Sequence, residues 1–167
     1  MPTAAEPVLN ESKILISDVS PLLFGGVMLI LVMITHAIFT EAVAYIRNHR
    51  IEPLVASKRI LNARLFLYLC FFLLLTAHLA EIGLWAYVLS LTGLVPDFHK
   101  ALFFSGSTYT TLGYGSDIMP LDWNSVTMVI ALSGMFSIAW TTSFLMGLIG
   151  LFHNRHLASS TRSRPGS

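Results

Sequence analysis

The chain has 167 residues, of which 54% are hydrophobic and 11% are charged, and its mean hydropathy is +0.70. Soluble domains carry about a quarter charged residues, so this composition excludes an ordinary soluble globule and indicates an integral membrane protein. The net charge of +1 also argues against a nucleic-acid partner.

The first segments of the chain are an arm and a membrane span. Residues 1–20 are polar and acidic for their length, and we expect a short extracytoplasmic arm there. Pro21 suits the start of a helix, and the following residues are apolar on every face, as a lipid-facing span should be. The segment 21–46 is long enough to cross the hydrocarbon layer, so we expect the first transmembrane helix there.

A basic loop over residues 47–64 connects the first and second spans. Pro53 is expected to end the helix, and residues 54–63 are expected to form a short interfacial helix. The second span is expected over residues 65–94, ended by a glycine and a proline. Trp85 and Tyr87, in its last third, are expected in the aromatic belt at the membrane surface.

A short helix and a glycine-bearing loop come next. Asp97 is expected to cap a helix over residues 98–109, which at about 12 residues is too short to cross a membrane. Gly113 and Gly115 then flank a tyrosine and leave the backbone able to take positive φ at alternate positions. Irregular backbone at membrane depth is tolerated only where protein buries it or where it lines a watery cavity. A re-entrant helix and loop are therefore expected, followed by a third span over residues 123–152.

The string Thr111-Leu112-Gly113-Tyr114-Gly115 resembles the T-x-G-Y-G selectivity filter of potassium channels, a ring of carbonyls that replaces the hydration shell of K⁺. Residues 100–104 are similar to the pore helix of that family, and Pro120 and Trp123 are similar to its outer mouth. The resemblance covers about residues 65–151, and it implies a pore domain over residues 65–152 with an outer helix, a pore helix, a filter and an inner helix. Residues 153–167 would form a cytoplasmic tail.

The resemblance implies roles for the filter residues. The carbonyls of Thr111, Leu112, Gly113 and Tyr114, together with the Thr111 hydroxyl, are expected to coordinate dehydrated K⁺, and Gly115 completes the filter. One loop supplies only part of a coordination shell, so the resemblance implies a homotetramer in the lipid bilayer. Transport would be passive conduction without catalysis, with K⁺ as the permeant ion and no cofactor.

Other residues of the pore domain receive candidate roles. Gly134 is a candidate gating hinge, with a packing glycine as the alternative. Thr142 and Met146, which are four residues apart, are candidates for lining the inner cavity. Asp117 and Asp122 are expected at the outer mouth, where acidic groups concentrate cations, and helix capping explains Asp122 equally well.

The chain departs from the potassium-channel pattern at two positions. Ser116 directly follows the last filter glycine, where relatives usually carry an acid, and Ser107 stands where many relatives carry an acid behind the filter. Both changes remove a familiar hydrogen-bond brace of the filter. A weakly selective cation channel therefore stays open as an alternative.

The basic residues indicate the orientation in the membrane. Of the ten Lys and Arg residues, most fall in the 47–64 loop and in the tail. The positive-inside rule places both segments in the cytoplasm, and the N-terminus and the filter outside. The chain is thus expected to be a multi-pass protein of the cell membrane, and no span carries the regularly spaced arginines of a voltage sensor.

Ionisable side chains inside the first two spans are functional candidates by their position. His36 and Glu41 lie in the first span, and His78 and Glu81 lie in the second span at a spacing that puts them on one face. Because the two spans run antiparallel, His36 and His78 should lie at similar depths. Three interpretations stay open: polar contacts between the spans, a protonation switch, and binding of a metal or a b-type haem by the two histidines.

The predicted fold is thus an all-α membrane protein with three transmembrane helices plus a re-entrant pore helix and filter loop, assembled as a tetrameric ion-channel pore. The predicted function is potassium-selective conduction without a voltage sensor. A weakly selective cation channel and a membrane metal or haem protein built on His36 and His78 are the alternatives.

Overall fold

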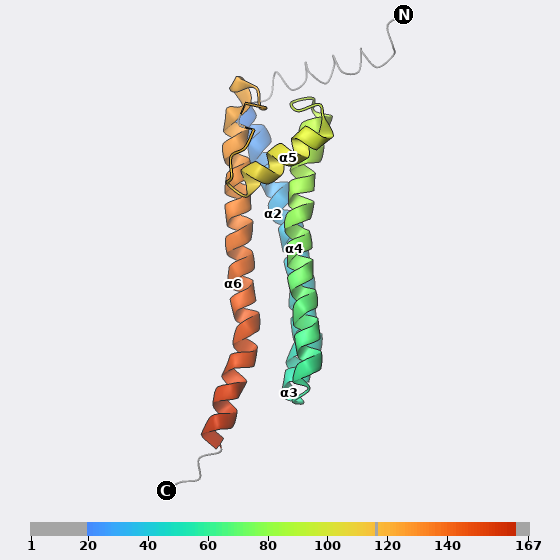
Figure 1. Cartoon of the computed structure of the whole chain (residues 1–167), viewed down its shortest axis with the longest axis vertical. Helices are drawn as coiled ribbons and strands as arrows, with labels where there is room; N and C mark the ends of the chain where they lie inside the picture. Colours follow the sequence, from blue (N-terminus) through green and yellow to red (C-terminus); the bar gives the residue numbers. More distant parts are fainter. Residues whose placement is uncertain (1–19, 116, 163–167) are drawn as a thin grey trace, which may run out of the picture. The chain divides into compact units, whose positions relative to one another are not determined.

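The computed structural model describes residues 20–115 and 117–162, and every regular element within them is a helix (Figure 1). Three helical stretches are long and apolar enough to cross a membrane, and one short helix separates the second from the third. The expected all-α fold is therefore confirmed. The expected arm lies outside the described residues, apart from Ser20.

The first long helix, α2 (Pro21–Ile46), covers the residues expected for the first span. It continues through a π-helical turn, η1 (Arg47–Ile51), into the short helix α3 (Glu52–Ala56). The expectation that Pro53 ends the helix is therefore wrong. The Glu52 N–H bonds to the carbonyl of Arg47, five residues back. Pro53 then falls in the first turn of α3, where a missing N–H costs little.

The second long helix, α4 (Ile60–Leu91), begins before the expected residue 65 and ends before the expected residue 94. The expected interfacial helix over residues 54–63 is replaced by the end of α3, a turn and the start of α4. Gly93 follows α4 with φ +75°, a left-handed conformation that commonly ends a helix. The proline after it was also expected as a stop.

The short helix α5 (Phe98–Tyr109) covers the residues expected for it. The Asp97 carboxylate accepts a hydrogen bond of 3.1 Å from the backbone N–H of Lys100, which confirms the expected cap. This hydrogen bond from Lys100 lowers the pKa of the Asp97 carboxyl below its ordinary value. A local sequence signal thus sets where α5 begins.

The last helix is longer than expected. A single 3₁₀ turn, η2 (Leu121–Trp123), leads into α6 (Asn124–Arg162). The helix therefore passes through residue 152, where the third span was expected to end, and includes most of the expected tail.

The chain divides into two compact units, and each long helix contributes to both. The first unit holds the residues up to His36 together with His78–Ser137, and the second holds Ala37–Ala77 and the residues from Ile138 onward. In the first unit, α5 lies between the ends of α4 and α6 (Figure 1). Side chains from α2, α4, α5 and α6 form the core of this unit, among them Val32, Trp85, Phe104, Tyr109, Val126 and Ile130.

Trp85 does not lie in an exposed aromatic belt, contrary to expectation. Its side chain is fully buried in the core of the first unit, and its Nε1–H donates a 3.1 Å hydrogen bond to the Ser133 hydroxyl. Ser133 in turn donates to the carbonyl of Ile130 at 2.7 Å. A buried indole needs such a partner, and a hydroxyl on α6 provides it.

The second unit has a separate apolar core. Val43, Ile51, Leu74 and Leu148 are buried in it, and so is Cys70. The lone cysteine thus packs as a small hydrophobic side chain.

Candidate functional site

The loop that follows α5 has an alternating backbone. Thr111, Gly113 and Gly115 have φ values of +62°, +74° and +80°, whereas Leu112 and Tyr114 between them do not have positive φ. The N–H groups of Leu112 and Gly113 point back to α5, so the carbonyls of Thr111 and Leu112, on the opposite side of the same trans peptides, point away from it. The glycines adopt positive φ freely. Thr111 is β-branched, and a strained φ of this kind costs about 1–3 kcal/mol.

Ser107 in the last turns of α5 holds this loop. Its carbonyl accepts the N–H groups of Leu112 at 2.8 Å and Gly113 at 3.2 Å. Its hydroxyl donates to the carbonyl of Tyr114 at 2.6 Å, with a longer contact of 3.2 Å to the carbonyl of Phe104. A carbonyl oxygen has two lone pairs, so the Tyr114 carbonyl keeps one for another partner. Ser107 therefore supplies a brace at the position where we expected a brace to be missing.

The end of α5 packs closely on α6 at Gly134. A Cβ atom built on this buried glycine would lie 2.0 Å from the carbonyl oxygen of Tyr109, which no side chain can tolerate. Gly134 therefore permits the contact between the two helices. The helix α6 runs through Gly134 without a break, and the role as a gating hinge stays a prediction.

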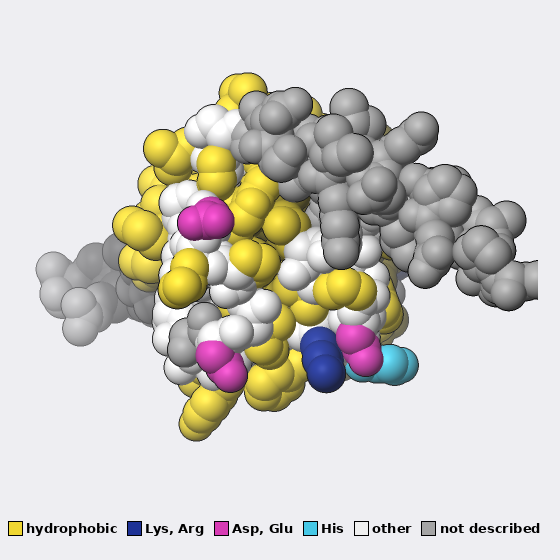
Figure 2. Space-filling model, turned by 90° about the horizontal axis from the view of Figure 1, so that it is seen from above, with side chains coloured by type: hydrophobic (Ala, Val, Ile, Leu, Met, Phe, Trp, Pro, Cys, Tyr) yellow, Lys and Arg dark blue, Asp and Glu magenta, His cyan; other side chains and the backbone are white. Residues whose placement is uncertain are grey.

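The remaining candidate pore residues lie apart from these contacts. Asp117 and Asp122 are exposed in the first unit, and Figure 2 shows acidic side chains spread among hydrophobic ones over one end of the molecule. Ser116 lies outside the described residues. Thr142 and Met146 belong to the second unit, and both are exposed.

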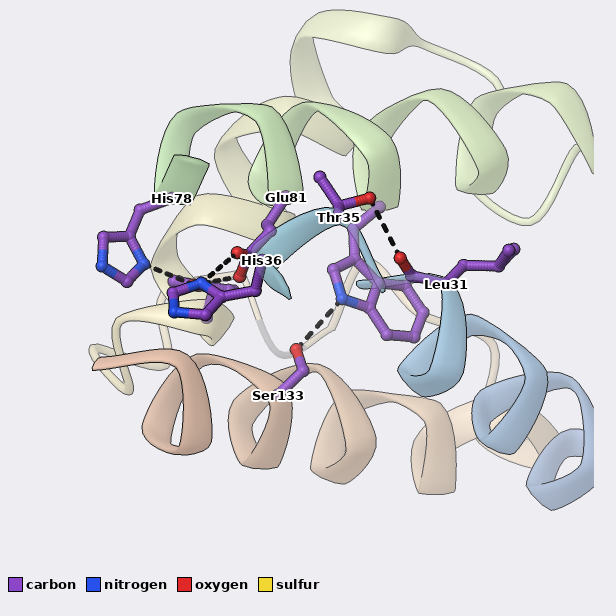
Figure 3. A network of polar contacts seen from close by, with 8 residues as sticks. Leu31, Thr35, His36, His78, Glu81 and Ser133 are labelled. Atoms are coloured by element: carbon purple, nitrogen blue, oxygen red, sulfur yellow. Dashed lines mark hydrogen bonds and ion pairs between the residues drawn. The ribbon is translucent and has the colours of Figure 1, made fainter. Parts of the chain in front are cut away.

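A buried polar network lies beside the end of α5 (Figure 3). His36 on α2 lies with its Nδ1 2.7 Å from Glu81 Oε1 on α4. The Tyr109 hydroxyl donates to Glu81 Oε2 at 2.6 Å, and His78 Nδ1 lies 2.8 Å from the same hydroxyl. The network therefore joins three helices of the first unit through one carboxylate.

The donors in this network follow from the chemistry of its groups. The Tyr109 hydroxyl donates to Glu81 Oε2, and a single shared proton joins His36 Nδ1 to Glu81 Oε1. The phenol has one proton, which it gives to Glu81, so His78 Nδ1–H donates to the phenol oxygen. His78 then carries a proton on Nδ1. His36 and Glu81 are fully buried and Tyr109 is nearly so, which makes each of these hydrogen bonds costly to lose.

The structure brings together three of the four ionisable residues that we singled out in the spans. His36, His78 and Glu81 converge, whereas Glu41 is exposed and belongs to the second unit. Tyr109, which bridges Glu81 and His78, was not expected in the network. The available signal was a tyrosine in a short helix between spans, since a buried phenol needs a hydrogen-bond partner.

Comparison with known families matches the part of the chain that runs from α4 into α6. Residues 65–150 match the model of a family described as ion channel, which is more than half of the chain. No curated protein and no solved structure matches the chain. The matched residues include α5, the alternating loop and most of α4, and they extend along α6. The chain therefore belongs to this ion channel family.

Proposed function

We propose that the chain is the subunit of a potassium-selective channel that conducts K⁺ passively. The observation that carries this proposal is the alternation of positive φ at Thr111, Gly113 and Gly115 directly after α5. Carbonyls that face one side can replace the hydration shell of a cation. The proposed ligands are the carbonyls of residues 111–114 and the Thr111 hydroxyl. Strain at Thr111 supports a functional loop, because strained residues cluster at such sites.

Four copies of the chain are proposed to surround the conduction path. A single loop offers too few oxygens to enclose a cation. Leu112 and Tyr114 are 66% and 64% exposed in the chain alone, and Phe103 on α5 is 60% exposed. Large apolar side chains left uncovered in this way support contacts with further copies. The C-terminal end of α5, with its partial negative charge, favours a cation beyond it.

The proposed channel lies in the cell membrane with its N-terminus outside and its C-terminus in the cytoplasm. The basic 47–64 segment supports this orientation through the positive-inside rule. Asp117 and Asp122 would then lie at the outer mouth, and their exposure in the first unit is compatible with a role in attracting cations.

Flux through the reconstituted protein tests the proposal. In liposomes, the wild type should pass K⁺ in preference to Na⁺, and its mass in detergent should correspond to four chains. Gly113→Ala should reduce K⁺ flux at least tenfold, because Gly113 has φ +74° while no atom lies within 4 Å of an added Cβ. The loss would therefore come from backbone conformation and not from a clash.

Gly147→Ala is the matched control, because Gly147 lies in α6 with equally open surroundings. Undiminished flux in Gly113→Ala would refute the assignment of the filter. Equal passage of K⁺ and Na⁺ by the wild type would identify the weakly selective cation channel instead.

A haem protein built on His36 and His78 fits the structure less well. The ring centroids of the two histidines are 5.5 Å apart, and the groups that bridge them are the Glu81 carboxylate and the Tyr109 phenol. A porphyrin between the rings would have to displace both groups and leave a buried carboxylate without its donors. A Soret band in the purified protein would overturn this reasoning.

A further inference from the structure

We infer that His36, His78 and Glu81 form a binding site for a divalent transition-metal ion such as Zn²⁺. Each residue offers one ligand atom, and these atoms all lie within 4.8 Å of one another. Imidazole nitrogens suit zinc, copper, nickel and iron, whereas magnesium and calcium prefer sites made of oxygen alone. The site lies outside the proposed filter, so it stands whether or not the pore selects K⁺.

The spacing of the ligand atoms is close to what a bound ion requires. Zinc lies about 2.0–2.2 Å from nitrogen and carboxylate ligands, which puts tetrahedral ligand atoms about 3.3 Å from one another. The 2.7 Å contact of His36 Nδ1 with Glu81 Oε1 is shorter, because a proton now occupies the place of the ion. Binding of the ion displaces that proton, so metal binding at this site is coupled to proton release. The ligand atoms that lie as much as 4.8 Å apart must move closer together on binding.

Tyr109 holds the carboxylate in place for this role. Its hydroxyl donates to Glu81 Oε2 at 2.6 Å, while Oε1 is directed at His36. Groups that hydrogen-bond a ligating carboxylate in this way fix its orientation, and their loss typically weakens metal binding about 10–100-fold. The carboxylate is therefore already oriented before an ion arrives.

The charge of the site also suits a divalent cation. Glu81 neutralises one of its two charges. Tyr109 is the last residue of α5, so the C-terminal end of that helix, with its partial negative charge, lies beside the cluster. His78 is the one ligand of the three that is not fully buried, and it offers the ion a path of access.

Metal analysis of the full chain tests the inference. The protein would be purified in detergent, stripped with a chelator and equilibrated with Zn²⁺, in a background where the tail residues His153 and His156 are replaced by Gln. We expect one zinc per chain by elemental analysis. Replacement by Co²⁺ should give the visible absorption of a tetrahedral site, a readout that requires no conduction.

Variants locate the site. Glu81→Gln, which keeps the shape of the side chain, should weaken Zn²⁺ binding at least tenfold, and so should His36→Gln. His99→Gln is the matched control, because His99 is exposed in the first turn of α5, and it should bind zinc as the background protein does. Tyr109→Phe should keep one zinc per chain with about tenfold weaker affinity.

Two results would overturn the inference: no zinc bound by the background protein, or unchanged binding in both Glu81→Gln and His36→Gln. If these two variants fail to elute as folded protein, His78→Gln decides, because the half-buried His78 is the ligand whose replacement disturbs the core least. Loss of zinc in that variant supports the site, and retention rejects it.

Discussion

Gly134 and Tyr109 form a backbone contact between α6 and α5, in which an added Cβ at Gly134 would lie 2.0 Å from the Tyr109 carbonyl oxygen. The obstructing atom belongs to the main chain, so no rotamer change can relieve the clash. Since Tyr109 ends α5, this contact also positions the start of the alternating loop. The glycine thus connects the packing of α6 to the backbone proposed to bind K⁺.

Gly134→Ala is expected to destabilise the protein by at least about 1–3 kcal/mol, the usual effect of overpacking a closely packed contact. Thermal unfolding of the purified protein measures this as a lower Tm, and K⁺ flux should fall with it. Gly147→Ala is the control, because no atom lies within 4 Å of its added Cβ and Ala favours a helix over Gly by about 0.5–1 kcal/mol. A similar Tm in both variants would contradict the contact.

Two serines on α5 should respond differently to removal of their hydroxyls. Ser107→Ala removes the 2.6 Å hydrogen bond to the Tyr114 carbonyl, so we expect lower K⁺ over Na⁺ selectivity and a loss of about 1 kcal/mol in stability. Ser105 is also buried, but its hydroxyl has no hydrogen-bond partner in the described part of the chain. Ser105→Ala should leave selectivity unchanged and stability equal or higher. The prediction fails if the two variants have the same selectivity.

Tyr109→Phe should destabilise the protein by about 1–3 kcal/mol, because it leaves a buried carboxylate oxygen of Glu81 without its donor. The change removes one oxygen atom and no ring, so packing is kept. Tyr87→Phe is the control on α4, because the Tyr87 side chain is 58% exposed and surface changes usually stay within about 0.5 kcal/mol. Thermal unfolding compares the two variants, and equal effects would show that the network contributes no stability.

Acid should weaken the N-terminal cap of α5. The hydrogen bond from the Lys100 N–H lowers the pKa of Asp97 in the folded chain below its ordinary value of 3.8. Its stabilising effect is therefore complete above the unfolded pKa near 3.8 and is lost as the pH falls through the lower folded value. Asp97→Asn keeps a capping oxygen but cannot titrate.

Thermal unfolding between about pH 6 and pH 2 checks this linkage. The Tm of the wild type should fall more steeply at the acidic end than that of Asp97→Asn. Asp97→Ala should have the lower Tm of the two variants at neutral pH, because it lacks the capping acceptor. Identical acid profiles for the wild type and Asp97→Asn would argue against the cap as the titrating group.

The sequence alone was sufficient to predict those features of the fold that depend on neighbouring residues in the chain. Asp97 directly precedes α5 and caps it, so the start of that helix could be predicted from one residue. Gly113 and Gly115 both take the positive φ that their spacing allows. The three long helices follow from apolar length alone, although α6 continues beyond the expected boundary.

The sequence alone could not predict contacts between side chains on different helices, because these contacts depend on how the helices are rotated against one another. The spacing of His78 and Glu81 placed them on one face of α4, but α2 is apolar on all sides and its pattern does not show that His36 faces Glu81. The Tyr109 phenol reaches Glu81 from α5, whose last residue packs on Gly134 of α6, and no local pattern indicates either contact. Thr111 has positive φ despite its β-branched side chain, which local preference alone argues against.

The π-helical turn at Arg47–Ile51 also determines which side of α3 faces the core. A turn of this type holds one residue more than an α-helical turn, and each residue of an α-helix advances the chain by about 100°. Ile51 and Val55 are buried with Val43 in the same core, on the side that this rotation selects. Deleting one residue from this turn would rotate the buried side of α3 away from the core. The segment should therefore tolerate substitutions better than changes in length.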